Sequence, residues 1–299
     1  MSSKMVSVDE NTRLWSESEG KAHDPAVLLI AGGNLSGYSW PGPFVAALIR
    51  GGVRVIRFDH RDTGKSTVTT DFHQHPYGFD DLVADALAVL DAWDIERAHV
   101  VGMSLGNTIV QLMAIRHPNR IASWCAMLGG ALDVDFDANI ERAIAGAPSI
   151  DGLPLPTDRF LEVLNLMSEQ PHTADELLEQ RVEKWRLLNG AGIPFDEEAF
   201  REYEQRAIDH AGNAEEPIVH HMIRQPSVDV ATHLATVRSP LLAIQAQSDP
   251  AAPPPHSQHL ADLVPHSRHV TIHDMGHAIS PHVHDRLATA ICDHVLAHS

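Results

Sequence analysis

One serine, one aspartate and one histidine occupy positions from which they can carry out nucleophilic chemistry together. Ser104 lies between two glycines in the segment 102–106 (GMSLG), which follows a short apolar run and opens a helical-looking one. A serine on such a strand-to-helix turn needs small neighbours, because the backbone is strained there and larger side chains would crowd the strand or the helix. The turn exposes the hydroxyl and aims the first amides of the helix at negative charge in front of it. We therefore interpret Ser104 as a nucleophile.

An acyl-transfer nucleophile needs a base within hydrogen-bond reach and a carboxylate that orients the base. Asp249 comes shortly after the apolar segment 240–245, and His277 lies in a turn after the predicted strand 269–272. Both are expected at the sheet edge where Ser104 emerges. The chain order serine, aspartate, histidine is the order found in α/β-hydrolases.

Two alternatives stay open at this point. Asp133 follows another predicted strand and could act as the acid in place of Asp249. His273 could replace His277, although it falls within the end of its predicted strand, whereas the glycine before His277 offers the turn that a mobile imidazole needs. Because the chain has 21 histidines, His277 is favoured by its position and not by its type.

The negative charge that develops on a substrate carbonyl oxygen needs two convergent N–H donors. Leu105, directly after the nucleophile, supplies one of them in this interpretation. The other is expected from Gly33 or from its neighbour Asn34, in a glycine-containing loop that follows an apolar strand. A glycine pair lets backbone amides approach a ligand closely.

The elements that must position these residues alternate along the chain. Segments 26–30 and 98–101 are continuously apolar, as expected of strands buried on both faces of a parallel sheet. Between them, segment 78–93 carries apolar residues at helical spacing. This alternation predicts the α/β class, with the α/β-hydrolase fold and a mostly parallel, doubly wound sheet. Further elements are expected as an antiparallel pair near Trp15, a helix at 44–50, and strands at 53–58, 121–128, 240–245 and 269–272.

The pattern changes after residue 134. Between 135 and 232 we predict helices and turns but no strand, and an insertion of this kind can cover the carboxyl edge of a sheet. We therefore predict a first core part at 1–134, a helical lid at 135–232 and a second core part at 233–299. The lid helices are expected at 138–145, 158–169, 173–189 and 196–210.

Composition narrows the classes of partner. The net charge is −18, from 40 acidic and 22 basic residues, which disfavours nucleic acid and anionic membranes because both require a basic face. No apolar core of a signal peptide and no run of transmembrane length is found, so a cytoplasmic protein is expected. Neither a monomer nor a homo-oligomer is favoured. The partner expected is a small-molecule substrate.

The remaining titratable residues have structural interpretations. The histidines lack the spacing of a metal site, so we expect no metal and no cofactor. Cys125 and Cys292 lie in apolar settings and are expected as free core thiols. The polar turn 59–66 lacks the glycine spacing of a nucleotide loop, and we expect its charges to hold loops together beneath the site.

The chain resembles the α/β-hydrolase superfamily over its whole length, on the residues Gly102-Met103-Ser104-Leu105-Gly106, Ser248-Asp249-Pro250 and Gly276-His277. It is similar more narrowly to the aclacinomycin methylesterases of anthracycline biosynthesis. The stretches that carry this narrower resemblance are 32–36, 58–64, 75–79, 135–142 and 206–212. Leu105 stands where the more usual elbow has methionine, which leaves a backbone donor in place.

The resemblance implies hydrolysis of a carboxylic methyl ester on a tetracyclic polyketide, with release of methanol. It places the catalytic triad at Ser104, Asp249 and His277. A planar aromatic substrate would suit a wide apolar cavity under the lid, although Met and aromatic residues on lid helices are also ordinary packing. Candidate lining residues are Asn34, Tyr38, Trp40, Met113, Phe160, Met167, Trp185, Tyr203 and Met222.

Other activities use the same triad. A general carboxylesterase or a lactonase acting on another small apolar ester is the main alternative, and carbon–carbon bond hydrolases and perhydrolases share the spacing. Haloalkane dehalogenases and epoxide hydrolases usually carry an aspartate at the nucleophile position, so Ser104 disfavours them. A ligand receptor on the same fold would commonly have lost a triad member, and this chain retains all three.

Overall fold

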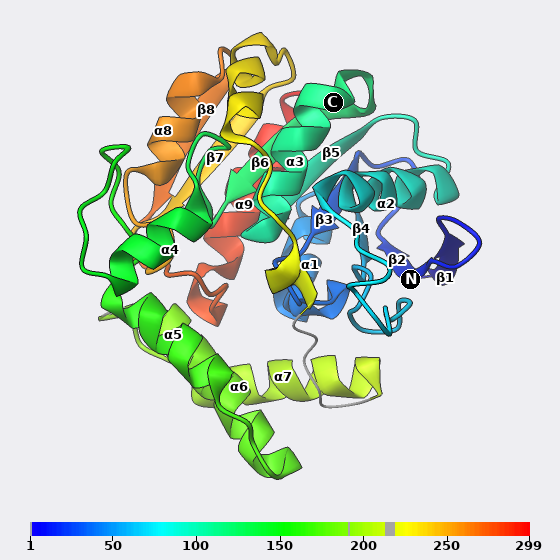
Figure 1. Cartoon of the computed structure of the whole chain (residues 1–299). Helices are drawn as coiled ribbons and strands as arrows, with labels where there is room; N and C mark the ends of the chain where they lie inside the picture. Colours follow the sequence, from blue (N-terminus) through cyan, green and yellow to red (C-terminus); the bar gives the residue numbers. More distant parts are fainter. Residues whose placement is uncertain (1, 191, 213–218) are drawn as a thin grey trace.

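A computed structural model describes residues 2–190, 192–212 and 219–299, and its centre is an eight-stranded sheet in the order β1-β2-β4-β3-β5-β6-β7-β8 (Figure 1). At one edge, β1 pairs antiparallel with β2, and β2 pairs antiparallel with β4. The other six strands, which are β3 to β8, run parallel to one another. This confirms the predicted fold class. The strands are β1 (Ser2–Ser7), β2 (Arg13–Glu19), β3 (Ala26–Ile30), β4 (Arg54–Phe58), β5 (Ala98–Met103), β6 (Ile121–Met127), β7 (Leu241–Ala246) and β8 (Ser267–Ile272).

Alternate residues of the central strands point to opposite faces of the sheet, and both faces are covered. In β3, Leu28 belongs to one apolar cluster and Leu29 to the other, and the neighbouring strand repeats this with Val100 and Val101. All four side chains are fully buried. Because both faces of these strands are buried, successive residues along each strand must be apolar. On the first face lie α2 (Phe79–Ala92), α3 (Leu105–Arg116) and α8 (His256–Leu263), and on the second lie α1 (Gly42–Arg50) and α9 (His284–Leu296).

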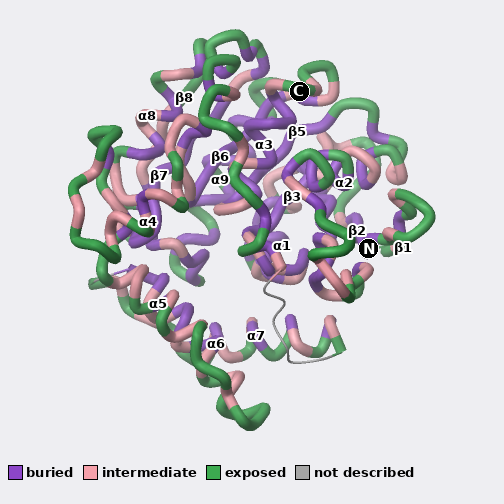
Figure 2. Tube along the Cα trace, in the orientation of Figure 1, coloured by how far each residue is buried: buried purple, intermediate pink, exposed green. Residues whose placement is uncertain are grey.

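Between β6 and β7 the chain forms further helices, of which α5, α6 and α7 lie beyond one end of the sheet (Figure 1). Among its described residues no strand occurs, while residue 191 and residues 213–218 of the predicted lid lie outside the described part. The outer sides of α5, α6 and α7 are exposed and their inner sides are buried (Figure 2). The elements are α4 (Phe136–Ile144), α5 (Asp158–Ser168), α6 (Ala174–Leu188), α7 (Glu197–Ala211) and the 3₁₀ segments η3 (Val219–Met222) and η4 (Val228–Thr236).

Local sequence explains where the lid helix α6 begins. The hydroxyl of Thr173 accepts a hydrogen bond from the amide of Glu176 at 3.1 Å, and the Glu176 carboxylate accepts one from the amide of His172 at 2.7 Å. Two amides at the helix start are satisfied in this way. At the other end of the helix, Trp185 and Leu188 pack in a small lid core that includes Ala278, the residue after His277.

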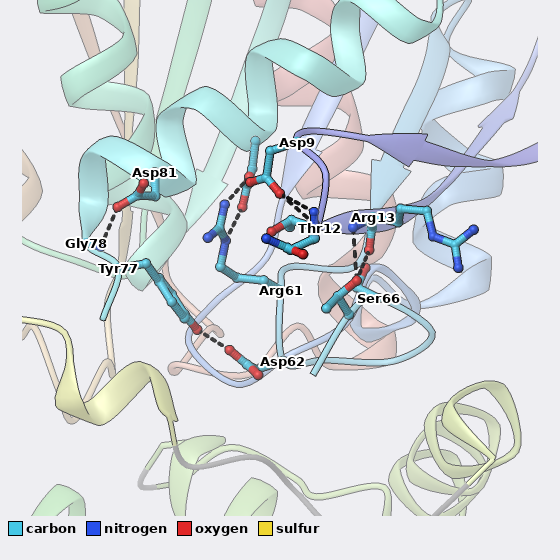
Figure 3. A network of polar contacts seen from close by, with 12 residues as sticks. Asp9, Thr12, Arg13, Arg61, Asp62, Ser66, Tyr77, Gly78 and Asp81 are labelled. Atoms are coloured by element: carbon cyan, nitrogen blue, oxygen red, sulfur yellow. Dashed lines mark hydrogen bonds and ion pairs between the residues drawn. The ribbon is translucent and has the colours of Figure 1, made fainter. Parts of the chain in front are cut away.

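The polar turn after β4 joins two helices and a loop through its charged side chains. Arg61 makes a paired ion contact with buried Asp85, at 2.8 and 2.6 Å. Asp62 accepts a hydrogen bond from the Tyr77 hydroxyl at 2.5 Å (Figure 3). Asp59 accepts from the Nε2 of His210 at 2.7 Å, which joins the lid helix α7 to the sheet.

Two further properties of the fold concern thiols and membranes. Cys125 and Cys292 are both free and buried, which confirms the predicted core thiols. Within the described residues, no helix combines the length and the apolar character that crossing a bilayer requires.

Candidate active site

Ser104 occupies the turn between β5 and α3, and its backbone is strained, with φ of 54° and ψ of −120°. Residues with side chains rarely adopt this region, and such strain is typical of a nucleophile held above a sheet. The close packing of the turn explains the flanking glycines. A Cβ on Gly102 would overlap the carbonyl of Gly106, and a Cβ on Gly106 would overlap the carbonyl of Ile30. The amide of Ser104 donates to the carbonyl of Met127 at 3.1 Å, which fixes the turn to the next strand.

Asp249 lies just beyond the end of β7 and is buried. Its Oδ1 accepts hydrogen bonds from the amides of Ala251 at 2.8 Å and Ala252 at 3.1 Å, and it lies 2.9 Å from Nδ1 of His277. Burial alone raises the pKa of the Asp249 carboxyl, but the His277 charge, the His277 hydrogen bond and the two amides together hold that pKa below its ordinary value. Asp249 is therefore ionised at neutral pH.

The hydrogen bond between Asp249 and His277 decides the role of each ring nitrogen. Because an ionised carboxylate only accepts, Nδ1 of His277 donates, and in the neutral imidazole Nε2 then carries the lone pair. His277 lines a cavity of about 350 Å³, and Ser104 lines the same cavity. An imidazole oriented this way by a carboxylate can take a proton from a nearby hydroxyl.

The two alternative residues lie elsewhere. Oδ2 of Asp133 is 2.8 Å from Nε2 of His259 on α8, and Asp133 does not line the cavity of Ser104. His273 is exposed at the end of β8 and does not line it either. The arrangement favours Asp249 and His277.

The residues of the two candidate N–H donors lie close to each other. Leu105 is the first residue of α3, and a Cβ placed on Gly33 would lie 3.5 Å from Cδ1 of Leu105. The amide of Asn34 donates instead to Nδ1 of His220 at 2.7 Å. Among the described residues, neither the amide of Gly33 nor that of Leu105 has an acceptor within the chain. The geometry thus favours Gly33 over Asn34 as the second donor.

The cavity in front of Ser104 brings together five of the nine predicted pocket residues. Phe160 and Met167 on α5, Trp185 on α6 and Tyr203 on α7 line it from the lid, and Asn34 lines it from the sheet. Its volume of about 350 Å³ falls in the range of small-molecule sites.

The other four predicted pocket residues lie outside this cavity. Trp40 and Met113 are fully buried, because each faces one of the two core clusters of the sheet. Met222 is 40% exposed and does not line the cavity, although His220, two residues before it, does. Tyr38 lines an adjacent cavity of about 520 Å³, which contains neither Ser104 nor His277.

Several lining residues were missed by sequence reasoning. Phe160, Val163, Leu164 and Met167 form one helical stripe on α5, so their spacing of three and four residues would have found Val163 and Leu164. The histidines that line the cavity show no such spacing in the sequence. The remaining unpredicted residues include Leu132, Val134, Phe136, Ile140, Leu188, Phe200, His220, His221 and His256.

The described part of the chain holds no group of three or more histidine, cysteine, aspartate or glutamate side chains placed to bind a metal ion. The charged residues of the cavity are few. Burial, together with the nearby carboxylates of Asp135 and Glu141, raises the pKa of the cavity residue Asp137. Most of the residues that line the cavity with Ser104 and His277 are therefore small or apolar.

Comparisons with known proteins agree with this arrangement. The family model of the alpha/beta hydrolase fold matches residues 25–281. The chain is 58% identical over 297 residues to the rhodomycin D methylesterase DauP of Streptomyces sp. (strain C5), covering 99% of each chain. It is 57% identical, with the same coverage, to the rhodomycin D methylesterase DnrP of Streptomyces peucetius.

Solved structures extend the likeness to the backbone. A putative aryl esterase from Burkholderia cenocepacia superimposes with a TM-score of 0.73 at 18% identity, covering 99% of both chains. At this identity the likeness supports the fold alone. Taken with the full-length matches to the two methylesterases, it places the chain in the alpha/beta hydrolase fold family, in the group that includes the rhodomycin D methylesterases.

Proposed function

We propose that this chain is a serine carboxyl-ester hydrolase that removes a methyl ester from an anthracycline-type aromatic polyketide. The observation that carries the proposal is identity of 58% over 99% of the chain to a protein named rhodomycin D methylesterase. The position of Ser104 and His277 on one cavity supports a serine mechanism.

In the first half of the reaction, Ser104 attacks the ester carbonyl carbon while its proton passes to Nε2 of His277. The carbonyl oxygen becomes negatively charged and is bound by the amides of Gly33 and Leu105. Asp249 holds the imidazole in the required tautomer and stabilises its positive charge. The tetrahedral intermediate then collapses, the methoxy group takes the proton from His277, and methanol leaves.

In the second half, a water molecule hydrolyses the acyl-enzyme. His277 takes one proton of the water as its oxygen attacks the acyl carbon, and then returns that proton to Ser104 as the carboxylic acid is released. Atoms balance as one ester and one water giving one acid and one methanol. No cofactor takes part in this cycle.

The lid side of the cavity supports an aromatic acyl group. Phe160, Trp185 and Tyr203 present ring surfaces, and the floor near Ser104 is formed by small and apolar residues. Planar ring systems gain both buried area and favourable ring contacts in such a site. The aromatic lining therefore supports the proposed substrate class. The cytoplasmic location stays a prediction.

The test follows methanol release together with the mass of the product, from a methyl-esterified anthracycline. The proposal expects one methanol per ester hydrolysed and a product lighter by one CH₂ group, with Ser104→Ala inactive on the same substrate. A short-chain p-nitrophenyl ester serves as the second substrate. Turnover of that ester alone would leave a general carboxylesterase or a lactonase and would overturn the proposed substrate.

A further inference from the structure

The cavity contains a histidine that the proposed reaction does not use. His220 lies in η3 of the lid, is 4% exposed and reaches the loop that follows β3. Its Cβ would lie 3.7 Å from a Cβ placed on Gly33, so it packs directly beside the proposed oxyanion donor. The two residues are far apart in the chain and come from the lid and from the sheet.

His220 and Asn34 hold each other by two reciprocal hydrogen bonds. The Asn34 amide donates to Nδ1 of His220 at 2.7 Å, and Oδ1 of Asn34 accepts from the backbone amide of His220 at 3.1 Å. The backbone of Asn34 has a φ of 58°, a left-handed conformation that asparagine tolerates better than most residues. Side chain and backbone of both residues are thus engaged.

A third contact fixes the tautomer of His220. Its Nε2 lies 3.1 Å from the carbonyl oxygen of Arg61, which can only accept a hydrogen bond. Nε2 therefore carries the proton, and Nδ1 is left with the lone pair that the Asn34 amide needs. This neutral tautomer suits both partners at once.

The surroundings keep the ring neutral. Burial, with nearby His60, lowers the pKa of His220 to about 3. The groups that face it are the His60 ring at 5.5 Å, the Tyr77 ring at 6.3 Å, the Arg61 backbone and its neighbour His221. Protonation would convert Nδ1 into a donor aimed at the donor of Asn34 and would break the contact.

This contact bears on the reaction through the peptide that follows Gly33. The Asn34 amide belongs to that peptide, so its hydrogen bond to His220 fixes the peptide plane and with it the backbone beside the Gly33 amide. It also removes the Asn34 amide as a competing donor. An oxyanion hole stabilises charge only when its donors are held in place before the reaction.

We propose that His220 is a positioning residue for ester hydrolysis, which holds the Gly33–Asn34 loop in the conformation that binds the oxyanion and so makes docking of the lid part of active-site assembly. The inference rests on the proposed function. The lid then does more than select a substrate, because one of its side chains completes the catalytic geometry.

Two substitutions of His220 each keep one of its two ring contacts, to Asn34 or to Arg61, and remove the other. In His220→Asn, the amide can place an acceptor where Nδ1 lies and lacks the reach to Arg61. In His220→Gln, the longer amide can reach Arg61 but leaves no acceptor at the Nδ1 position. His220→Leu removes both contacts, and His233→Leu, an exposed histidine on η4, serves as the matched control.

We expect His220→Leu and His220→Gln to lower kcat by about 10- to 100-fold with KM changed less than about threefold, and His220→Asn to stay within about threefold of the unchanged chain. His233→Leu should match the unchanged chain. Equal activity of the Gln and Asn variants, or full activity of the Leu variant, would overturn the proposal. Should the Leu variant fail to fold, the Asn and Gln pair decides alone.

A second readout separates positioning from general damage to the cavity. A trifluoromethyl ketone, whose addition product with Ser104 carries an oxyanion, should bind His220→Gln more weakly by about the factor lost in kcat/KM. Binding of the intact ester, measured in a Ser104→Ala background, should change by less than about twofold. Equal losses in both would assign His220 a merely structural role. All variants are also assayed on p-nitrophenyl acetate, so failure of the methyl-ester substrate leaves this test intact.

Discussion

The backbone amide of His277 donates a hydrogen bond of 2.7 Å to the carbonyl oxygen of Leu188, the last residue of the lid helix α6. The residue that carries the proposed base is therefore anchored to the lid as well as to Asp249. Gly276 makes the close approach possible, because a Cβ there would overlap the carbonyl of Asn189. The end of α6 and the loop that carries His277 are therefore packed directly against each other.

This packing predicts the effect of adding one methyl group. Gly276→Ala should push the His277 loop away from α6, with a loss of about 1–3 kcal/mol in the free energy of unfolding and at least about a tenfold loss in kcat. Urea unfolding and steady-state rates check both numbers. Gly78→Ala is the control, since a Cβ there meets nothing within 4 Å. An unchanged kcat in Gly276→Ala would show that the loop position is not required.

The assignment of the acid predicts unequal effects for two carboxylates. Asp249→Asn should lower kcat by about 10³- to 10⁴-fold, because the amide favours the wrong tautomer of His277. Asp133→Asn should leave kcat within about twofold, since Asp133 pairs with His259 outside the cavity. Steady-state rates of both variants on the same ester are the measurement. A greater loss of kcat in Asp133→Asn than in Asp249→Asn would assign the role of the acid to Asp133.

Stability should fall as the solution becomes mildly acidic. Burial lowers the pKa of His60 to about 4 and that of His220 to about 3, below the ordinary value of 6.5 that holds in the unfolded chain. Between pH 6.5 and 4 the unfolded chain therefore binds more protons, and the free energy of unfolding decreases by about 2 kcal/mol per histidine at pH 5.

The lowered pKa of Asp249 adds nothing in this window. The ionised Asp249 stabilises the fold at any pH above 3.8, which is the pKa of this carboxyl in the unfolded chain. This stabilisation is lost only as the pH falls through the lower pKa that the carboxyl has in the folded chain. Urea unfolding at pH 7.5 and at pH 5 provides the measurement. Equal or greater stability at pH 5 would contradict the burial of neutral histidines.

The aromatic lining predicts a change confined to large substrates. Phe160→Ala should raise KM for a methyl-esterified anthracycline by about 10-fold, because it removes ring contact from the cavity wall. KM for p-nitrophenyl acetate should change by less than about twofold, since its small acyl group lies near Ser104. An equal rise for both substrates would mean that the lid wall does not contact the acyl group.

The sequence predicted the parts of the site that depend on strand ends. Ser104 and Asp249 follow the buried strands β5 and β7, and His277 follows the edge strand β8. All three strands are parallel, and the carboxyl ends of parallel strands meet at one edge of a sheet. The nucleophile turn carried its own signal, since Gly102 and Gly106 are required by close backbone approach. These features are local, so a single sequence contains them.

Residues whose role depends on side-chain direction were harder to predict. Trp40 and Met113 are large and apolar like the lining residues, yet they face the sheet and fill its core. His220 has no spacing signal, because its partners Asn34 and Arg61 come from distant parts of the chain. Helix α8 was missed since three prolines precede it and polar residues fill its first turn. Tertiary packing determines the positions of these residues and of α8, and local sequence patterns do not reveal it.

Competition between two methyl esters is the most direct test of whether this chain selects an anthracycline ester, because the leaving group is then the same. A methyl-esterified anthracycline with a ¹³C-labelled methyl group is mixed with unlabelled methyl benzoate, and the isotope ratio of the released methanol gives the ratio of kcat/KM values. We expect at least about a 100-fold preference for the anthracycline ester, because the cavity would bind its ring system in the transition state. Equal release from both esters, or release from methyl benzoate alone, would contradict it.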